Sequence, residues 1–250
     1  MKVIAVNGIT KSGKTTVCEV LIAALTARGY SVGSVKEIHF EQFKIDPDEK
    51  TNTNRHKAAG SRLVTARGMY ETDILYQSML PIEDILAHYE QDFVILEGVT
   101  DCNCPRIITA HNQAEIEERI DCRAVAVAGV ISNTGVKELC GLPVFNPLTE
   151  AEALADFVEK MAFTPLPDFD PDCCSKCGYT CRELTGRIIA GQAKREDCVL
   201  IEQETELYIN GKYIKMVPFV QDVLGKAICA IAGTLDGYLE NSEVVVKIKR

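Results

Sequence analysis

The chain has 250 residues, and its hydrophobic content of 46% and charged content of 25% are ordinary for a globular protein. A formal net charge of −9 and an isoelectric point near 5.1 leave no general basic surface, which argues against nucleic acid as a partner. No apolar run approaches the roughly 20 residues that cross a bilayer, and the N-terminal residues have the pattern of a strand instead of a signal peptide. We therefore expect a cytoplasmic protein without a membrane partner.

The first predicted element is an apolar strand at residues 3–6, followed by a loop and the start of a helix. Gly8, Gly13, Lys14 and Thr15 match the pattern G-x-x-x-x-G-K-[ST] of a phosphate-binding loop, or P-loop. Glycine lets such a loop turn its backbone N–H groups inward, and the following helix points its positive end at the same place. Lys14 would contact the β- and γ-phosphates of a nucleotide, and Thr15 would bind Mg²⁺. The predicted nucleotide-binding residues are Gly8, Lys11, Ser12, Gly13, Lys14, Thr15 and Thr16.

Strands and helices alternate in the part of the chain that follows. The helix after the loop carries an apolar stripe and ends at Gly29. Further strands are expected at 31–36, 63–66, 93–96 and 124–131, and further helices at 55–59, 81–89 and 149–161. Thr149 and Glu152 have the spacing of a capping box, and the polar stretch at 37–54 is expected to be a long loop. The alternation predicts an α/β P-loop NTPase fold with a mostly parallel central sheet.

The composition changes at residues 164–171, which contain three prolines. We expect a P-loop domain at 1–163, a proline-rich linker at 164–172, a four-cysteine module at 173–199 and a small ββαβ tail at 200–250. In the tail, Asn210-Gly211 is typical of a two-residue hairpin turn. Residues 218–235 have a helical pattern, and residues 244–248 have the pattern of a closing strand.

Five of the eleven cysteines lie between Cys173 and Cys198. Four of them have the spacing Cys174-x2-Cys177-x3-Cys181-x16-Cys198, and four thiolates can bind zinc or an iron–sulfur cluster. Structural zinc sites usually combine two C-x-x-C pairs, and only one is present here. The segment resembles the [4Fe–4S] modules of corrinoid iron–sulfur proteins and electron-transfer subunits. We favour a [4Fe–4S] cluster, with Cys173 as an alternative ligand, over zinc or unligated thiols.

Residues 1 to about 162 resemble MobB, the family of GTP-binding accessory proteins of molybdopterin-guanine dinucleotide biosynthesis. Besides the P-loop, the matching segments are Ser34-Val35-Lys36 with His39, Asp46-Pro47, Arg55-x-x-Ala58-Ala59-Gly60, Phe93 to Gly98 and Leu154 to Val158. The loop after Gly98 departs from the family. The resemblance implies binding of GTP and Mg²⁺, a homodimer, and partners among molybdopterin-type cofactors and the enzymes that make or use them. The preference for GTP comes from the resemblance alone, because the sequence has no N-K-x-D motif.

Several polar residues are candidates for the chemistry. Glu97 ends a buried strand beside the P-loop, where a carboxylate can bind Mg²⁺ or orient a water molecule. Lys14 and Glu97 are therefore the expected catalytic residues, although Glu97 could instead cap the next helix. The expected substrate-binding residues are Lys36, His39, Asp46 and Arg55. The alternative for these four is that they are solvated surface groups.

The sequence thus predicts a GTP-binding accessory protein for a guanine-dinucleotide molybdenum or tungsten cofactor. Hydrolysis of GTP should be slow, because no arginine finger is evident in cis. The cysteine module would dock onto a target enzyme or sense its iron–sulfur state. An alternative is a non-catalytic electron-transfer or metal-insertion partner that uses nucleotide as a switch, and a third option is a small-molecule kinase with Asp46 as its base. Cys102 and Cys104 could supply a thiol pair, but inert reduced cysteines are more common.

Overall fold

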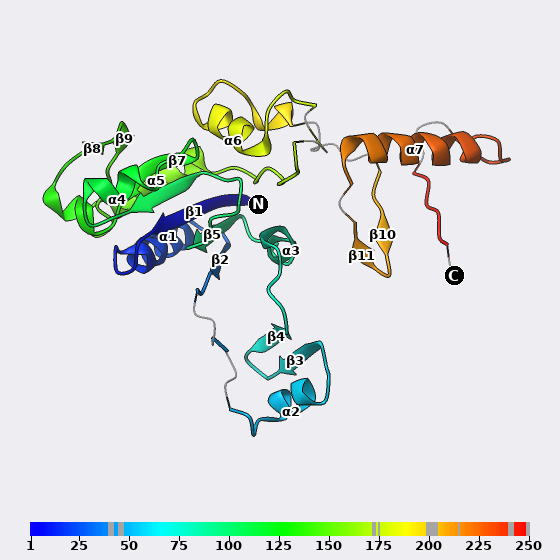
Figure 1. The fold of residues 1–250 in the computed structure, drawn as a ribbon, viewed down its shortest axis with the longest axis horizontal. Helices are drawn as coiled ribbons and strands as arrows, with labels where there is room; N and C mark the ends of the chain where they lie inside the picture. The colour runs from blue at the N-terminus through cyan, green and yellow to red at the C-terminus, as the bar shows by residue number, and fades with distance from the viewer. Residues whose placement is uncertain are drawn as a thin grey trace. The chain divides into compact units, whose positions relative to one another are not determined.

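A computed structural model describes residues 1–39, 43–44, 48–171, 174, 176–198, 205–214, 216–239 and 243–248. The chain forms two compact units, Met1–Pro167 and Asp168–Arg250 (Figure 1). Two residues singled out by the sequence, Asp46 and Cys173, lie outside the described residues. No helix in the described ranges is both long enough and apolar enough to span a bilayer.

The first unit is built on a five-stranded sheet in the order β2-β5-β1-β6-β7 (Figure 1). The strands are β1 (Lys2–Gly8), β2 (Val32–Lys36), β5 (Phe93–Glu97), β6 (Arg106–Thr109) and β7 (Ala124–Ala128). Every neighbouring pair is parallel. The predicted α/β fold with a parallel central sheet is confirmed.

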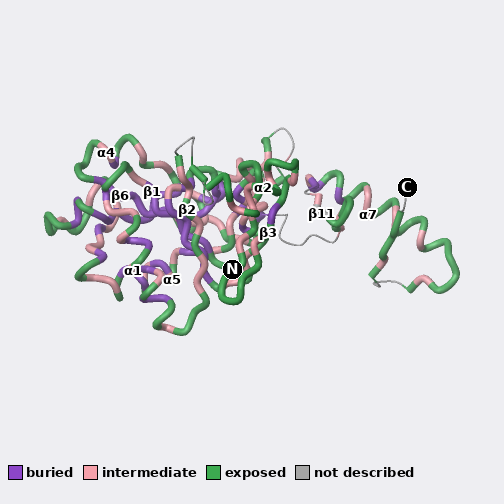
Figure 2. The backbone as a smooth tube through the Cα atoms, turned by 90° about the horizontal axis from the view of Figure 1, so that it is seen from below, coloured by how far each residue is buried: buried purple, intermediate pink, exposed green. Residues whose placement is uncertain are grey.

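Helices cover both faces of this sheet, because its central strands are apolar on both sides. Helix α1 (Lys14–Ala27) buries Val17, Leu21 and Leu25 and packs with α5 (Ala151–Met161). Val3 and Ala5 point to the opposite face, where they pack with α3 (Ile82–Leu86). Helix α4 (Gln113–Glu117) buries one side chain, Ile116, in a core cluster with residues of β6 and β7. Figure 2 shows the buried backbone concentrated in the strands of this unit.

Several details differ from the sequence predictions. The strand expected at 124–131 ends at Ala128, because Gly129 takes a φ of 81° and starts the 3₁₀ helix η1 (Val130–Thr134). The capping box of Thr149 and Glu152 is wrong: α5 begins after Glu150, whose carboxylate accepts a hydrogen bond from the backbone N–H of Asn146. Elements without a prediction are β4 (Thr72–Tyr76), β6, α4, β8 (Glu138–Leu139) and β9 (Leu142–Pro143).

An arm-like segment lies between β2 and α3 in the sequence. It consists of α2 (Asn52–Ala58) and an antiparallel hairpin of β3 (Leu63–Arg67) and β4 (Thr72–Tyr76). Thr51 caps α2 by accepting a hydrogen bond from the N–H of Asn54, so the helix starts before the predicted residue 55.

The second unit contains α6 (Cys181–Ile189), η2 (Arg195–Asp197), the hairpin of β10 (Tyr208–Ile209) and β11 (Lys212–Tyr213), and α7 (Pro218–Ala232). Asn210 and Gly211 both have positive φ, 53° and 77°, as a two-residue hairpin turn requires. The closing strand expected at 244–248 is wrong, since the described residues 243–248 form no strand. Its β-branched side chains are exposed, and β-propensity alone makes no strand without a pairing partner.

Candidate functional site

The P-loop joins β1 to α1 at the carboxyl edge of the sheet, where open α/β sheets bind ligands. Neighbouring strands hold its shape. The Ser12 hydroxyl, which is fully buried, lies 2.6 Å from the Thr109 hydroxyl at the end of β6, and the Ser12 carbonyl accepts a 2.9 Å hydrogen bond from the N–H of Val130 after β7. Lys11 and Gly13 have φ of 62° and 97°, so the loop turns sharply before α1. The predicted phosphate-binding residues therefore form one rigid turn.

Lys14 points back over this loop. Its Nζ donates to the carbonyl oxygens of Gly8, at 2.9 Å, and Ile9, at 2.6 Å. Burial is the main cause that lowers the pKa of Lys14, and the charges of Lys36 and Arg119 lower it further, whereas Glu97 raises it. A cation that is partly desolvated beside other cations is well suited to bind a polyanion.

Glu97 ends β5 and lies between the P-loop strand and β2, in register with Val6 and Lys36. Its side chain is almost completely buried, and Oε1 accepts a 2.7 Å hydrogen bond from the Thr15 hydroxyl and a further one from Lys36 Nζ. The structure thus places together the hydroxyl and the carboxylate expected to bind Mg²⁺. Hard oxygen donors of this kind fit that ion.

A cavity of about 480 Å³ opens beside the loop. Of the expected substrate residues it contains Lys36 and His39, together with Lys14 and Glu97. Arg55 does not reach it, because this residue belongs to the exposed surface of α2. Half of the expected substrate set is thus placed with the P-loop, one member is not, and Asp46 lies outside the described residues.

The cavity also contains residues that the sequence did not single out: Asn7, Thr10, Glu37, Gly98, Thr100, Arg106, Glu118, Arg119, Ile120 and Asp121. Asn7 ends an apolar strand next to the P-loop, and this signal could have identified it. Its side-chain N–H donates a 2.7 Å hydrogen bond to the carbonyl oxygen of Val99. Arg106 and Arg119 carry no local pattern, because the pairing of β6 with β1 places Arg106 and the connection through α4 places Arg119.

The comparisons with known proteins agree with this geometry. The family described as "Molybdopterin guanine dinucleotide synthesis protein B", or MobB, matches residues 3–133, more than half of the chain. The chain belongs to the MobB family.

Two relatives of this MobB-family chain show how far the similarity extends. One relative is a Methanocaldococcus jannaschii protein that is 27% identical over 99% of this chain and 97% of its own length. Its name describes an inferred molybdopterin-guanine dinucleotide biosynthesis adapter protein. A Bacillus subtilis protein with the same inferred role is 24% identical over 62% of this chain and 90% of its own length. The crystal structure of Bacillus subtilis MobB has a TM-score of 0.53 at 19% identity and covers 65% of this chain and 99% of that one. The similarity to the Methanocaldococcus jannaschii protein therefore includes the second unit, whereas the Bacillus subtilis structure matches about two thirds of the chain.

The cysteine module of this MobB-family protein lies in the second unit. Cys198 is buried, and Cys174, Cys177 and Cys181 are half-buried. Burial raises the pKa of Cys181, and the neighbouring Cys198 and Cys174 thiols raise it further. Within the described residues, no group of three or more metal-ligating side chains is gathered into a binding site. The four predicted ligands are therefore not gathered into a metal site in the described residues, and the alternative ligand Cys173 lies outside them.

Cys102 and Cys104 lie in the core of the first unit. A hydrogen bond with Cys104 is the main cause that raises the pKa of Cys102, and burial adds to it. Thiols with a raised pKa are poor nucleophiles and poor metal ligands. Both cysteines are buried among apolar side chains, so they act as packing residues.

Proposed function

We propose that the chain is a Mg²⁺-dependent GTP-binding adapter that acts in the assembly of a guanine-dinucleotide molybdenum or tungsten cofactor. The observation that carries this proposal is that Lys14 contacts the P-loop and Thr15 contacts Glu97, in a chain of the MobB family. The loop amides and Lys14 would bind the phosphates, and Thr15 and Glu97 would hold Mg²⁺. The hydrogen bond between Thr15 and Glu97 supports their joint role as Mg²⁺ ligands, because it places the two oxygens 2.7 Å apart.

The preference for GTP follows from the family. Calorimetric titration of the purified protein with GTP and with ATP, each with and without Mg²⁺, tests it. We expect GTP to bind more tightly than ATP and Mg²⁺ to strengthen the binding. Equal affinity for both nucleotides would contradict the guanine preference and leave a general nucleotide site.

The cavity beside the P-loop is the proposed site for the second partner, a molybdopterin-type cofactor. Lys36 and His39 would contact it from the end of β2. Ligand pockets commonly have volumes of ~300–1,000 Å³, so the space is adequate for a compound of this size. The alternative function, an electron-transfer or metal-insertion partner, is not favoured, because the family and both relatives point to the adapter role.

We further propose that Cys174, Cys177, Cys181 and Cys198 bind a [4Fe–4S] cluster used for docking or redox sensing. Their spacing supports this. The cluster would supply four iron–thiolate bonds that fix the second unit, and a redox centre if it is exposed to a partner.

Anaerobic purification is expected to give a brown protein with about four iron atoms per chain. Cys177→Ser should lower the iron content and the visible absorption. Cys229→Ser is the matched control, because Cys229 is exposed on α7 and outside the predicted set, and it should change neither. Stoichiometric zinc without iron, or full iron content in Cys177→Ser, would contradict the assignment.

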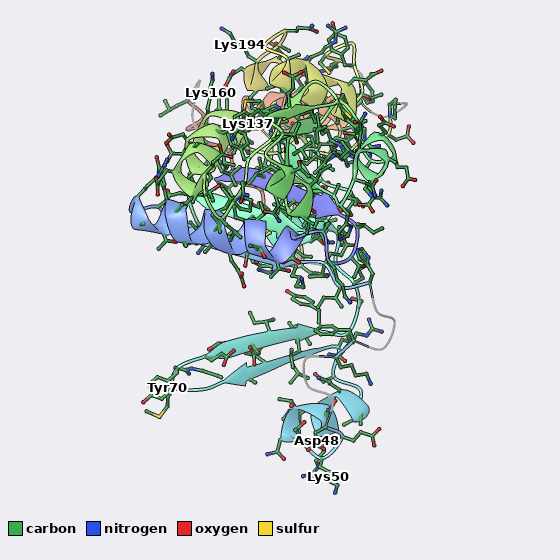
Figure 3. All side chains as sticks on the ribbon, turned by 90° about the vertical axis from the view of Figure 1, so that its left-hand side faces the viewer. Asp48, Lys50, Tyr70, Lys137, Lys160 and Lys194 are labelled. Carbon is green, nitrogen blue, oxygen red and sulfur yellow. The ribbon has the colours of Figure 1, made fainter. Side chains whose placement is uncertain are left out.

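We also propose that the chain forms a homodimer through the β3–β4 hairpin. Large apolar side chains are exposed there: Leu63 at 47%, Met69 at 92%, Tyr70 at 99% and Ile74 at 54%. Figure 3 shows Tyr70 at the tip of the hairpin. Several large exposed apolar side chains on one hairpin favour an interaction site, and a second copy of the chain satisfies the family expectation.

Sedimentation of the parent is expected to show a dimer. Replacing Met69 and Tyr70 by lysine should give a folded monomer, because both side chains are almost fully exposed in the single chain and make no buried contact within it. A parent that sediments as a monomer, or a dimer that survives the double substitution, would contradict the proposed interface.

A further inference from the structure

Arg119 is a cavity residue to which the adapter function gives no role. It follows α4 in the sequence and lines the same cavity as Gly8, Lys14 and Glu97. Lys14 and Arg119 line this one cavity, so both cations face the space that a ligand would occupy. The sequence indicated no arginine near the phosphates, because Arg119 is separated from the P-loop by more than half of the first unit.

The backbone of Arg119 is fixed with respect to the P-loop. Buried Arg106 donates a hydrogen bond from Nη2 to the Arg119 carbonyl oxygen, and the same Nη2 lies 3.0 Å from the Asp121 carboxylate. On the other side of α4, His111 Nε2 lies 3.1 Å from the carbonyl oxygen of Lys11 in the loop itself. The segment that carries Arg119 is therefore attached both to the sheet and to the phosphate-binding turn.

The guanidinium of Arg119 has N–H donors that the described hydrogen bonds do not use. Its two described side-chain hydrogen bonds run from Nη1 to the Glu115 carbonyl oxygen and to Glu118 Oε2, each 2.9 Å. A guanidinium has five N–H donors in a fixed plane, and these bonds use only one of its three nitrogens. The side chain is one-third exposed, so the guanidinium can turn toward a ligand in the cavity.

We propose that Arg119 contacts the terminal phosphate of the bound nucleotide and stabilises the negative charge that develops during hydrolysis. The inference rests on the proposed nucleotide site and adds a catalytic residue to it. In the reaction, the oxygen of a water molecule bonds to the γ-phosphorus while the bond from that phosphorus to the β–γ bridging oxygen breaks. The electron pair of the broken bond stays on the diphosphate, and the proton of the water leaves with inorganic phosphate or solvent. Arg119 stays protonated throughout and contributes only charge and hydrogen bonds.

Single-turnover release of phosphate from saturating GTP and Mg²⁺ tests this role in the full-length protein. We expect the parent to hydrolyse GTP at about 10⁻² s⁻¹, the rate typical of an arginine in cis, and Arg119→Ala to be about 1,000-fold slower. Arg119→Lys should lie between them, because it keeps the charge and loses the planar pair of donors. The affinity for GTP should change less than about 3-fold, since the interaction strengthens only in the transition state.

A second readout does not depend on turnover. GDP with aluminium fluoride and Mg²⁺ imitates the transition state, so its binding should weaken in Arg119→Ala, while GDP alone binds as before. The matched control is Glu117→Gln, because Glu117 is an exposed residue of α4 that does not line the cavity and accepts a hydrogen bond only from Gln113 among the described contacts; its rate should not fall.

Three results would overturn the inference. They are equal rates in the parent and Arg119→Ala, a loss of GTP affinity that matches the loss of rate, and a parent that binds GTP without releasing phosphate. Failure of the parent to bind GTP at all is a different result, because it contradicts the proposed function itself.

Discussion

Replacing Lys14 by alanine is expected to weaken GTP binding about 100-fold or more. Lys14 lies at the first turn of α1, and its ammonium group donates hydrogen bonds to two carbonyl oxygens of the P-loop. Truncating one member of a desolvated charge pair typically costs about 2–5 kcal/mol, and each 1.4 kcal/mol corresponds to a tenfold change in the dissociation constant. Calorimetric titration with GTP and Mg²⁺ measures the change.

The matched control is Lys11→Asn. Lys11 is the other lysine of the loop, and it has a φ of 62°. Asparagine tolerates this left-handed conformation, so the substitution removes a charge while keeping the backbone of the loop. We expect a loss of affinity below about 5-fold. If Lys14→Ala binds GTP as tightly as the parent, the nucleotide site has been assigned to the wrong loop.

Replacing Gly129 by alanine is expected to lower both the stability of the protein and its affinity for nucleotide. Gly129 follows β7 with a φ of 81°, and a Cβ atom there would lie 2.2 Å from the carbonyl oxygen of Ser12 and 2.9 Å from Cβ of Thr109. Left-handed strain costs about 1–3 kcal/mol, and overpacking costs a similar amount. Because the collision is with the backbone of the P-loop, the loop must move.

Gly135→Ala provides the control for backbone strain. Gly135 has a nearly equal φ of 78°, but nothing lies within 4 Å of a Cβ atom at that position. Both variants should lose stability in urea, by about 1–3 kcal/mol for Gly135→Ala and by more for Gly129→Ala. Only Gly129→Ala should also lose GTP affinity. Normal GTP binding by Gly129→Ala would show that β7 does not support the loop.

The sequence predicted the sheet and the P-loop because both have strong local signals. Residues 3–6 and 93–96 are apolar on both faces, and only a buried parallel strand satisfies such a run. The strand β6 had no prediction, because its four residues include Arg106 and Thr109, whose polar groups are satisfied only in the folded chain. The closing strand at 244–248 was predicted from side-chain type alone, and strand pairing depends on a partner elsewhere in the chain.

The residues of the candidate site also differ in how far the sequence alone could identify them. Lys14, Thr15 and Glu97 are recognisable because their spacing to a strand or helix end fixes their position. Arg119 and Asn7 reach the cavity through tertiary contacts that a single sequence does not display. Arg55 was expected from a match to a family segment, and in the structure it lies on α2 and does not line the cavity.

The hydrogen bond from Lys36 to Glu97 links the binding of a metal ion to the binding of an anion. A divalent cation bound at Oε1 of Glu97 would displace the ammonium group of Lys36 from that oxygen. Lys36 lines the cavity, so its released ammonium would be placed to attract an anionic ligand there. Binding of the metal and binding of the anion would then strengthen each other by the same factor.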